Sequence, residues 1–209
     1  MTSKLSLEQS VKDQFAKVFT SNDWGLFKEV AEINLAEAAM LKKSSFKGVE
    51  QKRQLLIRNT RKRLLIGIGS ELLLKAVYLK TGHSINKPLS PGKDLNLPFK
   101  LAKDIQGQLN SNDTFTFNQL TDHLKNVLVL PNPDLVLNGL KIAKVFRNKE
   151  GHVVTSLHKY DPLSYRAIEA AFIEIYARAF DEKLTVRFSL EAGEKGVWCV
   201  APIDSRDRS

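Results

Sequence analysis

Residues 146–152 of this chain, FRNKEGH, bring together two side chains that could cleave a phosphodiester through a 2'-hydroxyl. Arg147 carries a permanent positive charge on a rigid fork of N–H donors. His152 is a base that titrates near neutral pH. Such a pair can take the proton from a ribose 2'-hydroxyl and hold the charge that develops on phosphorus. An arginine followed within a few residues by a histidine arises by chance in roughly half of chains with this composition, and Asn148 directly after Arg147 makes the combination rarer.

The sequence lacks the motifs of other catalytic classes. The chain has no phosphate-binding glycine loop, and Gly67 and Gly69 are not followed by the third glycine of a dinucleotide-binding motif. The single cysteine, Cys199, excludes an intrachain disulfide and makes a cysteine zinc site improbable. The sequence therefore predicts neither a metal nor a cofactor.

The three other histidines are scattered. His83, His123 and His158 do not have metal-ligand spacing. We interpret His123 as a surface or capping residue on its helix. His158 is close enough to His152 in sequence to be an accessory group.

The net charge of +9 over 209 residues is concentrated in one segment. Residues 42–63 hold nine basic side chains and one acidic one, a net charge of +8, whereas the rest of the chain is close to neutral. A basic stripe on a helix is typical of a protein that binds a polyanion, although it also fits a solvated helix face.

The chain shows no features of a membrane or secreted protein. No run of 18 or more apolar residues is present, so no membrane span is expected. The first residues, MTSKLSLEQ, lack the apolar core of a signal peptide. We expect a cytoplasmic location.

Hydrophobic spacing predicts a mainly α protein that ends in a β-hairpin. We expect a helical extension in residues 1–20, a helical domain in residues 21–180, and a C-terminal hairpin with a polar tail in residues 181–209. Residues 83–98, rich in proline, are expected to form a loop, and residues 110–113 a turn. The expected helices are residues 7–19, 24–38, 46–81, 98–109, 116–128, 133–150 and 162–180, and the hairpin strands lie within residues 184–201.

The longest predicted helix is apolar nearly all round over residues 64–79, which favours a position at the centre of a bundle. Gly67 and Gly69 lie within it, where they allow close helix approach or mark a kink. Glu71 and Lys75 are the only charges within residues 64–79 and are spaced as an i,i+4 pair. We interpret this pair as structural, at the edge of the core, or as an accessory to the site.

Arg147 continues the apolar row of Val136, Leu140 and Ala143 on the helix over residues 133–150. An arginine in that row faces an interface or a cleft. On an ideal helix His152 would point about 140° away from Arg147. Gly151 is suited to a left-handed helix end, which would turn His152 back toward Arg147.

This order of parts resembles the HEPN family, the nucleotide-binding domain of higher eukaryotes and prokaryotes. Residues 70–82 are similar to the family's central helix, and residues 147–152 are similar to its Arg-x4-6-His motif, including the polar residue after the arginine. The likeness covers roughly residues 21–180, so the terminal helix and hairpin look like additions to a HEPN-like helical bundle.

The resemblance implies a metal-independent endoribonuclease that works as a homodimer, with two motifs meeting between subunits. His152 would be the general base, Arg147 would hold the scissile phosphate, and Asn148 would orient the phosphate or the histidine ring. The products would be a 2',3'-cyclic phosphate and a 5'-hydroxyl. The basic helix would guide RNA by phosphate contact, chiefly through Arg58, Arg61, Lys62 and Arg63. Many members are toxins of toxin–antitoxin or phage-defence systems, and any antitoxin here would be a separate chain.

Two alternatives stay open at this stage. In the first, the chain resembles the family as a non-catalytic dimer that binds RNA or a partner protein. Alternatively, it is an unrelated helical protein in which the motif is accidental.

Overall fold

A computed structural model describes residues 6–20, 23–41, 48–89, 108–150 and 162–187. They are mainly helical, as predicted. The helices are α1 (Leu7–Thr20), α2 (Trp24–Met40), α3 (Gly48–Lys80), α4 (Phe117–His123), α5 (Pro133–Glu150) and α6 (Pro162–Ile175). A short 3-10 turn, η2 (Leu124–Asn126), follows α4, and a π-helical turn, η3 (Tyr176–Phe180), extends α6. The two strands are β1 (Asn86–Pro88) and β2 (Leu109–Thr114).

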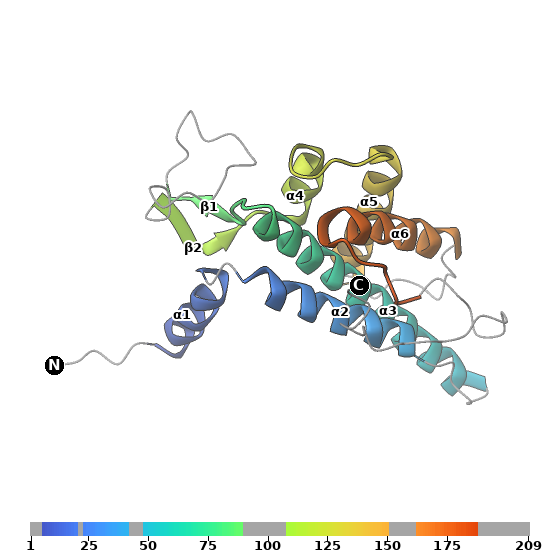
Figure 1. Ribbon diagram of the computed structural model, residues 1–209. Coiled ribbons are helices and arrows are strands. Elements are labelled where there is room, and N and C mark those ends of the chain that lie inside the picture. Colours follow the sequence, from blue (N-terminus) through green and yellow to red (C-terminus); the bar gives the residue numbers. More distant parts are fainter. Residues whose placement is uncertain (1–5, 21–22, 42–47, 90–107, 151–161, 188–209) are drawn as a thin grey trace.

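Helix α3 is the axis of the bundle (Figure 1). Helix α2 packs along one side of it and α5 along another, and α6 covers α5. The N-terminal end of α3 extends beyond the neighbouring helices, whereas α1 lies apart from the bundle and contacts β2 (Figure 1). The predicted central helix is therefore confirmed.

The C-terminal half of α3 is central because it is apolar on every side. Leu73, Leu74 and Val77 are fully buried there. The polar side chains in this half find partners: the Ser70 hydroxyl donates to the Ile66 carbonyl at 2.6 Å, and the Tyr78 hydroxyl to the Leu120 carbonyl at 2.8 Å. Burial of these groups therefore leaves their hydrogen bonds intact.

Helix boundaries follow capping signals in the sequence. The Asp23 carboxylate accepts a hydrogen bond from the Leu26 amide at the start of α2, at 3.2 Å. Thr116 and Gln119 form the predicted capping box of α4. Gly82 ends α3 with a positive φ of 77°, a conformation that glycine adopts without strain.

Two predictions between α3 and α4 are wrong. Part of the expected loop, Asn86–Pro88, is strand β1, and the expected turn at residues 110–113 lies within strand β2. The strands pair antiparallel with an irregular register. The Asn86 side chain donates to the Asn110 carbonyl at 3.0 Å, and Lys87 pairs with Asp113 at 3.0 Å. These cross-strand contacts override the low strand propensity of asparagine and aspartate. The helix expected over residues 98–109 falls largely outside the described residues, and Leu109 is in β2.

The C-terminal hairpin is also not formed in its described part. Residues 182–187 follow η3 as an irregular segment without a strand, and residues 188–209 lie outside the described residues. Val186 is buried in the core, and Arg187 pairs with buried Glu169 of α6 at 2.5 Å. Leu184 and Val186, the two described apolar residues of the alternating pattern, therefore pack on the helical core instead.

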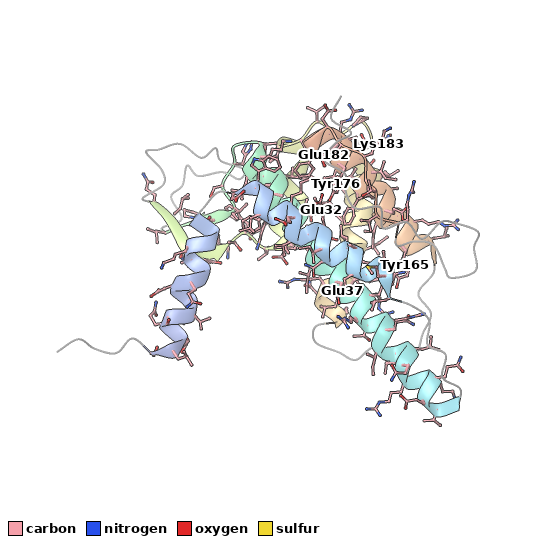
Figure 2. All side chains as sticks on the ribbon, turned by 60° about the horizontal axis from the view of Figure 1, so that its bottom comes forward. Glu32, Glu37, Tyr165, Tyr176, Glu182 and Lys183 are labelled. Carbon is pink, nitrogen blue, oxygen red and sulfur yellow. The ribbon has the colours of Figure 1, made fainter. Side chains whose placement is uncertain are left out.

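A buried ion pair ties this segment back to α2. Lys28 contacts Glu32 and Glu182, each at 2.8 Å, and the Tyr176 hydroxyl donates to Glu32 at 3.1 Å. Figure 2 shows Glu32, Tyr176 and Glu182 gathered at one place. Burial alone would lower the pKa of Lys28, but its hydrogen bonds to Glu182 and Glu32 outweigh burial and raise it. The ammonium therefore stabilises the fold at neutral pH, and its contribution is lost only as the pH rises through that raised pKa.

Replacing this lysine should destabilise the protein. Lys28→Met leaves two partly buried carboxylates without their cation, and we expect a loss of about 2 kcal/mol, below the 3–5 kcal/mol of a fully buried pair. Urea unfolding measures the loss. The control is Lys12→Met, which removes a lysine from an exposed pair with Glu8 and should cost less than about 0.5 kcal/mol. Equal losses in the two variants would contradict a stabilising role for the Lys28 cluster.

Candidate functional site

Arg147 occupies a position where the rest of its helix row is buried. Val136, Leu140 and Ala143 in this row of α5 are fully buried, as is neighbouring Phe146. The Arg147 side chain is 44% exposed, so it lies at the border of the core. The sequence left two positions open for this arginine, an interface or a cleft, and its contacts with α3 decide between them.

Helices α3 and α5 approach each other closely at Gly67. A Cβ atom placed on Gly67 would lie 2.5 Å from the Arg147 Cβ and 2.6 Å from the Arg147 backbone nitrogen. Only glycine fits that space, since ordinary contacts begin beyond 3.4 Å. Gly69 is also tight, with a Cβ that would lie 3.1 Å from the Ala31 carbonyl oxygen of α2. Of the two roles considered for these glycines, the structure supports close approach.

Glu71 lies one helical turn beyond Gly67 and meets Arg147 directly. The Arg147 Nε lies 2.8 Å from Glu71 Oε2, and the Lys75 Nζ lies 3.3 Å from Glu71 Oε1. The side chains of Glu71 and Lys75 are only 13% and 7% exposed. One carboxylate thus holds two cations, each through a different oxygen, and the three charged groups sum to +1. The predicted Glu71–Lys75 pair is confirmed, with Arg147 as an additional member.

Asn148 touches the same guanidinium from the solvent side. The Arg147 Nη1 donates to the Asn148 Oδ1 at 3.4 Å, at the long limit of a hydrogen bond. Arg147 is therefore held by Glu71 at Nε and by Asn148 at Nη1, while its side chain stays within reach of solvent. A preorganised cation at the surface is what binding of a phosphate requires.

Three of the predicted RNA-contacting residues lie at or near the surface of α3. Arg61 is exposed and pairs with Glu37 of α2. Arg58 is half-buried and donates to the Asn59 side chain at 3.1 and 3.3 Å. Lys62 is half-buried, with its Nζ 4.8 Å from the centre of the Tyr165 ring. These three residues are spaced i, i+3 and i+4, so they share one face of the helix.

Arg63 was wrongly placed with them. It is only 1% exposed, so it cannot contact an RNA phosphate at the surface of this chain. The physical reason is helical phase: Arg63 lies four residues before Gly67, in the row that faces α5. A dense cluster of basic residues hides this phase when the charges are simply counted.

His152, the general base expected from the sequence, falls outside the described residues, as do Gly151 and His158. His83 and His123 are described. The His83 ring contacts the Thr81 hydroxyl at 3.0 Å and the edge of the Tyr78 ring. It lies past the end of α3, whereas Glu71 is about 14 Å along the helix from that end. His123 is the last residue of α4 and is half-buried.

In the part of the chain that the structure describes, no group of three or more His, Cys, Asp and Glu side chains is arranged to hold a metal ion. Within the same residues, no helix has the length and hydrophobicity to cross a membrane.

Sequence reasoning identified Arg147, Gly67 and Glu71 separately but did not join them. The signals were present, because Arg147 lies on an apolar row and Gly67 lies in a helix interior. Tyr165, beside Phe146 and Lys62, was not identified as a functional residue at all. A single tyrosine near the start of a helix gives no pattern that would have found it.

Comparison with protein-family models, with curated proteins and with solved structures finds no match for this chain.

Substitution of Gly67 tests the close approach of α3 and α5. Alanine ordinarily stabilises a helix interior by up to about 1 kcal/mol relative to glycine. In Gly67→Ala the new methyl group collides with the Arg147 backbone, so we expect a net loss of about 2 kcal/mol in chemical denaturation. The control is Gly25→Ala, whose nearest neighbour is the tip of the Asp23 side chain at 3.1 Å, with an expected change within about 0.5 kcal/mol. A gain in stability for Gly67→Ala would contradict the close approach.

Proposed function

We propose that this protein is a metal-independent endoribonuclease that cleaves RNA through attack of the ribose 2'-hydroxyl. The observation that carries the proposal is the position of Arg147: a partly exposed arginine in a buried helix row, held by a nearly buried carboxylate and followed by Asn148. An arginine needed only for solubility has no reason to occupy such a position. A phosphate-binding arginine benefits from it, since its donors are oriented before the substrate arrives.

Glu71 directs how a phosphate would approach. Because Glu71 engages the Nε edge of Arg147, the phosphate meets the Nη side of the guanidinium, beside Asn148. Lys75 keeps the net charge of the cluster positive, so the site attracts a phosphate despite the carboxylate. We assign Glu71 and Lys75 as residues that position Arg147, and Asn148 as a residue that orients the phosphate or the base.

The proposed reaction has one chemical step. His152 takes the proton from the 2'-hydroxyl, and the 2'-oxygen attacks the adjacent phosphorus. Arg147 stabilises the dianionic transition state, and the bond from phosphorus to the 5'-oxygen breaks. The leaving 5'-oxygen takes a proton from water, and His152 returns its proton to the solvent. The products are a 2',3'-cyclic phosphate and a 5'-hydroxyl. In the proposed homodimer, two such motifs face one another.

The basic face of α3 supplies the affinity for RNA in this proposal. Arg58, Arg61 and Lys62 would contact phosphates without reading the bases, so binding should weaken as salt increases. Buried Arg63 is excluded from this role.

A cleavage assay in EDTA tests the reaction. We expect the wild type to cut total RNA or tRNA in the presence of EDTA and to leave 2',3'-cyclic phosphate ends. His152→Ala should slow cleavage about 10²- to 10⁴-fold because it removes the base. Arg147→Ala should slow it at least about 10²-fold because it removes the stabilising charge.

Matched variants control for loss of a histidine or an arginine elsewhere. His123→Ala and Arg178→Ala change described residues outside the proposed site and should keep wild-type rates. Cleavage that survives His152→Ala would contradict the assignment of the base. Salt-sensitive RNA binding without any cleavage would support the alternative, a non-catalytic dimer that holds RNA or a partner protein.

A further inference from the structure

The Tyr165 ring on α6 is held beside the candidate site by residues of two other helices. Its centre lies 5.5 Å from that of Phe146, a buried ring of α5 that directly precedes Arg147. The Lys62 Nζ of α3 lies over the Tyr165 ring, 4.8 Å from its centre. Tyr165 itself is only half-buried. The ring is thus supported by the core on the Phe146 side and meets a flexible ammonium group from α3.

Helix α3 contacts both the Tyr165 ring and Arg147, through Lys62 and Gly67. Lys62 lies five residues before Gly67, which corresponds to about 7.5 Å along the helix axis. Stacked nucleotides rise about 3.4 Å each, so about two nucleotides span this length. Figure 2 shows Tyr165 at the end of α6 away from Tyr176 and Glu182, so the Lys28 cluster is separate from this place.

An aromatic ring and a cation at this distance from a phosphate-binding arginine form the chemistry of a nucleotide subsite. Proteins bind single-stranded nucleic acids by stacking exposed bases on aromatic side chains while basic residues follow the backbone. Bases within a duplex are already stacked and cannot reach such a ring.

We propose that Tyr165 stacks against an unpaired nucleobase next to the scissile phosphate and that Lys62 binds a phosphate of the same strand. The substrate class is therefore single-stranded RNA. In the free protein Lys62 covers the ring, and in the complex the base takes its place while the ammonium moves to the phosphate. The inference rests on the proposed function for the placement of RNA at Arg147, but base stacking does not require cleavage.

Binding of a strand that cannot be cleaved separates this inference from the reaction. The probe is a short fluorescent 2'-O-methyl RNA, which has no 2'-hydroxyl nucleophile, measured by anisotropy as a single strand and as a duplex of the same sequence. We expect the wild type to prefer the single strand. Tyr165→Leu should weaken single-strand binding about 5- to 100-fold and duplex binding less than about 2-fold, because only the single strand can stack.

Two further variants separate stacking from charge. Tyr165→Phe keeps an aromatic ring and should bind the single strand within about 2-fold of the wild type. Lys62→Met should reduce the slope of log affinity against log salt by about 1, as the loss of one phosphate contact predicts. Lys125→Met removes the same charge from an exposed lysine of η2 and should leave the slope unchanged.

Each adverse outcome identifies what fails. The inference is overturned if Tyr165→Leu weakens single-strand and duplex binding equally, or if it leaves binding unchanged. It is also overturned if the wild type does not bind the single strand. Cleavage that depends on Arg147 while Tyr165→Leu binds normally overturns the inference and leaves the proposed function intact. A selective effect of Tyr165→Leu in a protein that never cleaves RNA supports the inference and overturns the ribonuclease.

Discussion

The ion pair between Glu71 and Arg147 is the interaction on which the candidate site depends. Its Nε–Oε2 distance of 2.8 Å joins the two central helices, α3 and α5, at the place where Gly67 lets their backbones approach. A nearly buried carboxylate needs a cation, and Arg147 and Lys75 both meet that need. The same pairing restricts the orientation of Arg147 at the surface. Stability and proposed function therefore share one constraint.

The rest of the bundle keeps these groups in place. Gly139 of α5 fits tightly against Ala167 and Ala171 of α6, so α5 is held close to α6 as well as to α3. On the other side of α3, Gly69 allows α2 to pack closely. Lys28 of α2 in turn holds the segment after η3 through its ion pair with Glu182. Small residues at helix contacts and a few buried ion pairs thus determine how the helices sit around α3. Tyr165 of α6 is also held by this packing, because its ring lies against Phe146 of α5.

Local patterns predicted the helical part of this fold well. Apolar periodicity and caps located α3 and α5 to within a few residues, and the glycines of α3 indicated close packing. The strands β1 and β2 were missed because pairing between distant residues such as Lys87 and Asp113 decides them, not local propensity. Arg63 was misplaced because charge density says nothing about the direction of a side chain. The partnership of Glu71 with Arg147 joins residues 76 positions apart in sequence, which no local spacing rule can detect.

A double-mutant cycle between Glu71 and Arg147 tests the central claim most directly. The free energy of unfolding is measured for the wild type, Glu71→Gln, Arg147→Met and the double variant. Because Glu71 is nearly buried, we expect a favourable coupling of about 1–2 kcal/mol, above the range of most exposed pairs. A coupling below about 0.3 kcal/mol would mean that the carboxylate does not hold the arginine. The structural basis for a preorganised phosphate site would then be lost.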